Sequence, residues 1–173
     1  MLEKRLVELW KKYQRQMSSD KLNEILARGI CYSEVKHACP ILVTGINPSY
    51  RHGDTACNKD ISTFSYQKII RNGDDHYFHA INKLFPEYWK AKVEYLDILN
   101  FRETDQNVVW DFCKDGNGLE FVAQNLRFSQ LMIEQVIQPR LIVVKNKSSW
   151  DLWGKSATPS GNIWMGYKFE LEK

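Results

Sequence analysis

Three short apolar runs, separated by helical stretches, constrain the fold of this chain more than any other feature. They are "ILVTG" at 41–45, "VEYLDIL" at 93–99 and "LIVV" at 141–144. The first and third runs are continuous rather than alternating, which is typical of strands buried on both faces in a parallel sheet, and the second reads as a further strand. Strands that alternate with helices indicate a three-layer α/β domain with a mostly parallel sheet.

The stretches around these runs carry the three- and four-residue apolar spacing of helices. Residues 1–30 read as a helical hairpin broken near Ser18, and further helices are expected at 74–85, 118–138 and 148–154. A fourth strand is expected within "NIWMGYKFELE" at 162–172, whereas 51–73 shows no clear period and reads as a long loop. We therefore predict a single domain, an α/β/α sandwich with an about four-stranded sheet, in which the hairpin covers a core at 38–173.

Length and composition limit the classes of protein that the chain can belong to. With 173 residues it has the usual size of one domain, and no apolar run approaches the roughly 18 residues of a membrane span. The first residues, "MLEKRLVELWKKYQRQ", lack the continuous apolar core of a signal peptide. We therefore expect a cytoplasmic, monomeric protein that does not associate with a membrane.

Cysteine spacing predicts neither a disulfide framework nor a metal centre. None of the four cysteines forms a C-x-x-C pair, and the set Cys31, His37, Cys39 and Cys57 matches no zinc spacing. We expect no metal and no cofactor.

Polar side chains follow each of the three apolar runs. They are Asn47 after the first run, Asn100 after the second, and Lys145 with Asn146 after the third. Ligands bind beyond the carboxyl ends of the strands in open parallel sheets. If the strands are adjacent, these side chains are expected to converge on one crevice.

The segments that carry these polar residues resemble the uracil-DNA glycosylase superfamily. "VTGINPS" at 43–49 is similar to its first motif, where a strand ends in a Gly-Ile-Asn-Pro turn, a form that points to the mismatch-specific branch. "VEYLDILNF" at 93–101 resembles its second segment, and "QPRLIVVKNKSSWDLWG" at 138–154 its third. The resemblance implies an enzyme that excises uracil or a related damaged base from single-stranded or mismatched DNA.

Roles for individual residues follow from this resemblance. Asn47 would orient the attacking water, and because an amide is not a strong base its chemistry would be slow. Asn100 would read the edge of the flipped base. Phe64 would stack on the base, with Tyr50 as the competing choice. The remaining residues of the first motif would shape the pocket. Gly45 and Pro48 would form the turn, and main-chain N–H groups near Ile46 would contact the base. Ser49, with its small side chain, would leave the pocket wide.

Basic side chains near the third segment are the candidates for contacts with the DNA backbone. They are Lys145, Lys147 and Lys155. Basic patches of this size are compatible with phosphate binding, and equally with an ordinary solvated surface.

Two alternatives stay open at the level of sequence. The family's C-terminal His-Pro-Ser loop has no counterpart after the expected fourth strand, which suits a catalytically silent module that binds nucleic acid or a nucleotide. An unrelated small-molecule enzyme could also use the same strand-end crevice, because a fold does not by itself imply a function.

Overall fold

A three-stranded parallel sheet forms the centre of the protein, in a computed structural model that describes residues 2–35, 37–51, 60–73, 75–154 and 164–167. The strand order is β4-β2-β5, with β2 at Ile41–Gly45, β4 at Val93–Asp97 and β5 at Leu141–Val144. Both pairings are parallel, so all three carboxyl ends lie at the same edge of the sheet. The three expected runs are therefore strands, and the α/β class is confirmed.

A second, two-stranded parallel sheet extends the layer beyond β4. It pairs β1 (Ile30–Ser33) with β3 (Ile61–Phe64). An antiparallel bridge between Ile30 and Phe101, and a bond from the Cys31 amide to the Asn100 carbonyl (2.9 Å), attach it to the chain after β4. Neither strand was expected from the sequence, and β3 lies within the stretch that read as a loop.

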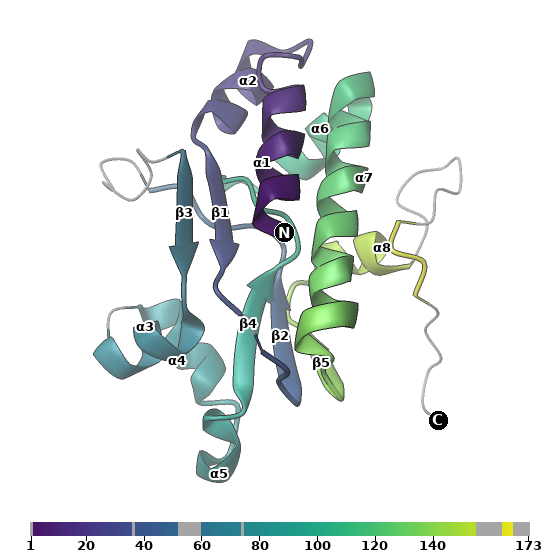
Figure 1. The fold of residues 1–173 in the computed structure, drawn as a ribbon. Coiled ribbons are helices and arrows are strands. Elements are labelled where there is room, and N and C mark those ends of the chain that lie inside the picture. Colours follow the sequence, from purple (N-terminus) through teal and green to yellow (C-terminus); the bar gives the residue numbers. More distant parts are fainter. Residues whose placement is uncertain (1, 36, 52–59, 74, 155–163, 168–173) are drawn as a thin grey trace.

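Helices surround this layer (Figure 1). Both helices expected at the N-terminus are present, although the first packs mainly on the long helix before Pro139 rather than on the second. The helix before Pro86, that long helix and the short helix before Gly154 are present as well. Three of the described helices, α3, α5 and α6, were not expected. The bounds are α1 Leu2–Tyr13, α2 Asp20–Ala27, α3 Tyr66–Asn72, α4 His76–Asn82, α5 Glu87–Lys90, α6 Val108–Lys114, α7 Gly116–Leu131 followed by a π-helical turn at Met132–Ile137, and a 3-10 turn at Lys147–Ser149 before α8 Trp150–Trp153.

Alternate residues of each strand face two different hydrophobic clusters, because side chains along a strand point to opposite faces. Leu42 of β2 and Leu96 of β4 belong to the larger cluster, which includes residues of α1, α2, α6 and α7. Val43 and Tyr95 belong to the smaller cluster with Tyr66 of α3. Figure 1 shows α3 and α4 on the opposite side of β4 from α7, and the sheet is thus covered on both faces.

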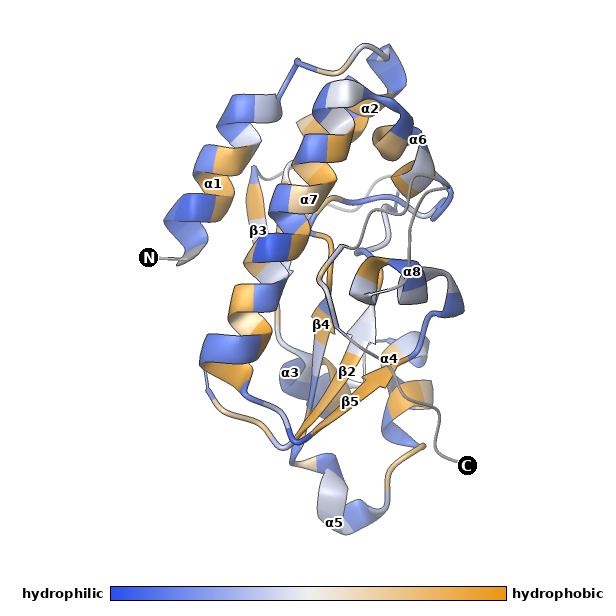
Figure 2. Cartoon of the chain, turned by 90° about the vertical axis from the view of Figure 1, so that its right-hand side faces the viewer, coloured by the Kyte–Doolittle hydropathy of each residue, from blue (hydrophilic) through white to orange (hydrophobic). Residues whose placement is uncertain are grey.

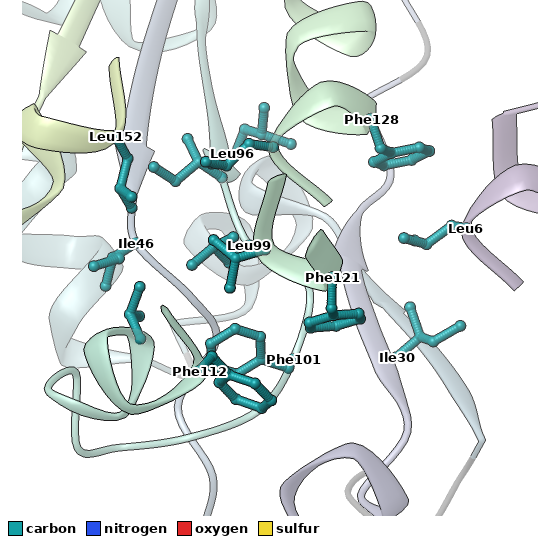
Figure 3. Packing of buried hydrophobic residues seen from close by; sticks show 14 of the residues in the cluster. Leu6, Ile30, Ile46, Leu96, Leu99, Phe101, Phe112, Phe121, Phe128 and Leu152 are labelled. Carbon is teal, nitrogen blue, oxygen red and sulfur yellow. The ribbon is translucent and has the colours of Figure 1, made fainter. Parts of the chain in front are cut away.

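The larger cluster is dominated by aromatic packing under α7. The Phe121 ring meets the Trp10 ring edge-on, with centroids 5.1 Å apart, and lies 5.6 Å from Phe112. Figure 3 shows Phe101, Phe112 and Phe121 together beside Leu99. Figure 2 shows the hydrophobic stripes of α1 and α7 and the largely hydrophobic β2 and β5. Burial of these faces, rather than helix propensity, is the main source of helix stability.

The expected fourth strand at 162–172 lies mostly outside the described residues. Its described part, residues 164–167, does not form a strand. There the Met165 and Tyr167 amides donate to the Leu152 and Trp153 carbonyls of α8, at 3.2 and 3.0 Å. Within the described ranges, no helix has both the length and the apolar character that a membrane span requires.

The junction of α6 and α7 makes a testable prediction. A Cβ added to Gly118 would lie 2.4 Å from the Phe112 carbonyl oxygen, which is backbone, whereas one added to Gly116 meets nothing within 4 Å. Because backbone cannot move aside easily, Gly118→Ala should lower the free energy of unfolding by about 1–3 kcal/mol. Gly116→Ala should leave it unchanged or raise it by up to about 1 kcal/mol. Urea unfolding of both variants measures the difference, and equal stabilities would contradict the close approach of the two helices.

Candidate ligand-binding site

A cavity of about 300 Å³ opens at the carboxyl ends of the central strands. Its walls come from the loops after β2, β4 and β5 on one side and from β3, α3 and α4 on the other. The lining residues are Cys31, Ile46, Asn47, Pro48, Ser49, Arg51, Ser62, Thr63, Phe64, Ile69, Asp75, Tyr77, Phe78, Tyr95, Asp97, Arg102, Gln106 and Asn146. Two wider hollows, between α1 and α7 and beside Trp164, are bounded by helix faces and contain no strand-end residues.

All three central strands contribute a polar side chain to this cavity. Asn47 comes from the turn after β2, Asp97 is the last residue of β4, and Asn146 follows β5. The Asn146 Nδ2 group donates to Gln106 Oε1 at 2.7 Å, which joins the β5 end to the loop after β4. The expected convergence of strand-end side chains therefore occurs, but β4 supplies Asp97 rather than Asn100.

Asn100 lies away from the cavity. Its side chain is fully buried, and its Nδ2 group donates to Asn125 Oδ1 of α7 at 2.9 Å. β4 ends at Asp97, and the Ile98 and Leu99 amides of the following segment donate to the Gly45 and Ile46 carbonyls at the end of β2, so the chain has left the strand before it reaches Asn100. Asn47 and Asn100 therefore do not share one site.

Asn47 is held rigidly by its own amide. Its Nδ2 group donates to the carbonyls of Pro48 (3.1 Å) and Glu103 (2.6 Å), and only 8% of the residue is exposed. The Oδ1 atom is buried and has no hydrogen-bond partner among the described residues. Because both amide protons are used, the acceptor capacity of this buried oxygen is the part of the side chain that the described residues leave unused.

An ion pair fixes the two loops that Asn47 joins. Arg28 of the segment after α2 contacts Glu103 at 2.7 Å, and each side chain is only 14% exposed. The same guanidinium lies 4.1 Å from the centroid of the Tyr50 ring. Burial raises the pKa of Glu103, but hydrogen bonds from the Asp105 and Thr104 amides and from Arg28 outweigh it and leave this pKa below its ordinary value. Tyr50 thus packs on the Arg28 side of this ion pair and is not among the residues that line the cavity.

Aromatic rings form one wall of the cavity. Phe64, at the end of β3, stacks on Phe78 with centroids 5.9 Å apart and planes 29° apart, and lies 6.1 Å from the Tyr95 ring. Of the two aromatic residues that the sequence offered as a stacking platform, the structure brings Phe64 to the cavity. The pocket-shaping residues Ile46, Pro48 and Ser49 also line it, and Ser49 is exposed.

Gly45 makes room for the polar groups at the base of the cavity. It pairs in register with Asp97, and a Cβ on it would lie 1.9 Å from Tyr95 Oη and 2.3 Å from Asp97 Oδ1. The residue before the Ile-Asn-Pro turn is therefore glycine because the neighbouring strand places two side chains against its α-carbon.

Asp97 is the most unusual group of the site. Its residue is 4% exposed, and its only hydrogen bond in the described part of the chain is the one that Tyr95 Oη donates to Oδ1 at 2.8 Å. Burial raises the pKa of Asp97 to about 7, although the hydrogen bond from Tyr95 opposes this rise. The sequence reading passed over Asp97 as part of an apolar run, yet a carboxylate inside a buried strand is itself a signal of function.

Cationic side chains surround the cavity without pairing with Asp97. Arg102 is 5% exposed and donates to Ser62 Oγ, while Arg51 forms an ion pair with Asp75 at 3.0 Å. The Lys145 ammonium lies 3.6 Å from the centroid of the Tyr77 ring, and burial lowers its pKa. Lys147 is exposed on the 3-10 turn beside α8, and Lys155 lies outside the described residues.

Neither the described side chains nor comparisons with known proteins assign a ligand to the site. In the described part of the chain, no three His, Cys, Asp or Glu side chains gather closely enough to hold a metal ion. No protein-family model matches the chain, and no curated protein or solved structure matches it either. The chemistry of the cavity must therefore be inferred from its own residues.

The raised pKa of Asp97 predicts a characteristic pH dependence of stability. Burial raises this pKa from an ordinary value of 3.8 to about 7, so between these values the folded chain keeps a proton that the unfolded chain has lost. The free energy of unfolding of the wild type should therefore fall as the pH rises from about 4 to about 7, relative to Asp97→Asn, which carries no titrating group. Between about pH 4 and about pH 8 the difference in the free energy of unfolding should change by roughly 2–4 kcal/mol in favour of the variant. Denaturant unfolding across this range measures the difference, and a constant difference would contradict a raised pKa.

Proposed function

We propose that this chain takes an unstacked base of DNA, uracil or a related damaged base, into the strand-end cavity and hydrolyses its N-glycosidic bond. The observation that carries the proposal is the pairing of Asn47 Oδ1, buried and without a partner among the described residues, with the Phe64 ring in one cavity at the carboxyl ends of parallel strands. The resemblance of "VTGINPS" to a glycosylase motif supports the same reading.

The residues of the cavity suit the steps of such a reaction. The base would stack on Phe64, since an aromatic face accepts any flat heterocycle. Asn47 Oδ1 would accept a hydrogen bond from a water molecule and direct its lone pair toward C1′ of the sugar. The C1′–N bond breaks as the water oxygen bonds to C1′, the base leaves with the electron pair, and the water proton ends on the base. Because an amide cannot take this proton, the reaction would be slow.

Cationic groups at the rim are suited to the sugar–phosphate backbone. Arg51 is exposed and lines the cavity, Lys145 lies over the ring of Tyr77, which also lines it, and Lys147 is exposed on the 3-10 turn that follows β5. Contacts of this kind fix the register of a nucleic acid and make its affinity depend on salt. Affinity for a single-stranded oligonucleotide should therefore fall as the salt concentration rises.

A silent binding module is the second candidate, and one observation favours it. The Asn47 amide is a structural link between two loops, through the Pro48 and Glu103 carbonyls. This structural role of the side chain requires no catalysis. Such a module would bind an oligonucleotide without cutting it, whereas a small-molecule enzyme that uses the same crevice would show no affinity for DNA even at low salt.

Asn47 is the residue whose removal tests catalysis. With uracil-containing single-stranded and mismatched oligonucleotides, the wild type should form abasic sites, and Asn47→Ala should lower the rate by roughly 100-fold because the water loses its orientation. Abasic product is measured by alkaline cleavage and gel electrophoresis. Asn72→Ala makes the same change at an exposed position of α3 outside the cavity, and should leave the rate unchanged. If the wild type yields no more product than Asn47→Ala, the protein is not a glycosylase for these substrates.

The two aromatic residues give a matched test of stacking. Phe64→Leu should weaken binding of a uracil-containing oligonucleotide by about 1–3 kcal/mol, because leucine keeps the volume but loses the flat face. Tyr50→Leu removes an aromatic ring that packs on Arg28 outside the cavity, and should change the affinity by less than about 0.5 kcal/mol. Fluorescence anisotropy measures both affinities. A larger loss at Tyr50 than at Phe64 would move the base-binding surface away from the cavity.

A further inference from the structure

We infer that Asp97 reads the edge of the bound base as a neutral carboxylic acid, donating one hydrogen bond and accepting another. The inference rests on the proposed function and names the chemical class of base that the cavity takes. That class presents one acceptor and one N–H donor side by side, as uracil does with its O4 and N3–H groups. A base edge on which no acceptor stands beside an N–H donor is excluded.

The position of Asp97 carries the first step. The residue lines the cavity, is 4% exposed, and faces the same side of the sheet as Tyr95 because the two are separated by one residue along β4. The glycine opposite it in β2 leaves its carboxyl group uncovered by a Cβ. Among the described residues, its carboxyl group has one hydrogen bond, which the Tyr95 hydroxyl donates to Oδ1. The rest of the carboxyl group is therefore left for a ligand.

The surroundings of Asp97 favour its neutral form. A buried carboxylate needs a cation or several donors to stay ionised, and here a single tyrosine hydroxyl donates. Arg102 is bonded to Ser62 of β3, Arg51 is paired with Asp75 before α4, and Lys145 after β5 lies over the Tyr77 ring. The Tyr77 and Tyr95 hydroxyls are 3.3 Å apart, and burial keeps the pKa of both above the ordinary value. No described group thus supplies a compensating positive charge.

A neutral carboxyl group offers the same pattern as an amide. Oδ1 accepts from Tyr95 and still has a lone pair for an N–H group of the base, so the proton on Oδ2 can be donated to a carbonyl oxygen. An ionised carboxylate would instead accept twice, and would repel a carbonyl oxygen on the base. As long as it holds its proton, Asp97 can therefore read the base edge, the role that the family resemblance implied for Asn100.

The experiment compares binding at two pH values. The probe is a single-stranded oligonucleotide with one 2′-fluorodeoxyuridine, which resists hydrolysis, and the reference is the same strand with an abasic analogue in its place. The ratio of the two affinities isolates the contribution of the base from that of the backbone. The wild type and Asp97→Asn are measured at about pH 5.5 and about pH 8.5, on either side of the expected proton loss.

The expected result is specific to a proton on Asp97. For the wild type the ratio should fall by roughly 10- to 30-fold as the pH rises. For Asp97→Asn, whose amide keeps one donor and one acceptor, it should stay within about 3-fold at both pH values. Asp97→Leu should lose the base contribution throughout. A wild-type ratio that does not change with pH would overturn the inference.

The outcome is separable from that of the proposed reaction. A pH-dependent base contribution without any abasic product would uphold the role of Asp97 and remove the glycosylase function. Abasic product together with a base contribution that does not depend on pH would uphold the glycosylase function and remove the role of Asp97. No base contribution at either pH would remove the role of Asp97, whatever the cleavage assay gives.

Discussion

The parallel pairing of β2 with β4 is the constraint on which the rest of the structure depends. It sets Gly45 opposite Asp97, and the missing Cβ lets Tyr95 Oη and the Asp97 carboxyl group occupy space that any other residue would fill. The same pairing aligns the carboxyl ends of the strands, so the turns that follow them meet. A shift of one residue would turn Asp97 toward the opposite face, because side chains alternate along a strand.

Hydrogen bonds and an ion pair connect the loops around the cavity to one another, in addition to their connections to the sheet. Asn47 bonds to the Glu103 carbonyl, the Glu103 amide bonds to the Pro48 carbonyl, and Arg28 pairs with the Glu103 carboxylate in a half-buried setting. Removing one partner of such a pair leaves a charge with poor solvation. These links keep the amide oxygen of Asn47 at a fixed position, which is what a group that orients water requires.

The site combines a fixed acceptor, an aromatic platform and a buried acid. Each has a different physical origin: the acceptor depends on loop bonds, the platform on the end of β3, and the acid on burial at the last residue of β4. A flat heterocycle with hydrogen-bonding edges satisfies all three at once. The proposals for catalysis and for base reading use different members of this set, and can therefore be judged independently.

Local sequence patterns determined much of this protein. The continuous apolar runs indicated the three central strands, and helical spacing with Gly and Pro stops indicated α1, α2, α7 and α8. The Gly-Ile-Asn-Pro turn pointed to Asn47. Only the tertiary structure decided where β4 ends. The apolar residues Ile98 and Leu99 continue the run in the sequence, but β4 ends at Asp97, and their amides donate to the Gly45 and Ile46 carbonyls at the end of β2. That boundary moved the strand-end residue from Asn100 to Asp97. Likewise, the pairing of β1 with β3, which brings Phe64 to the cavity, joins residues 31 positions apart (Ile30 with Ile61, and so on) that no local pattern connects.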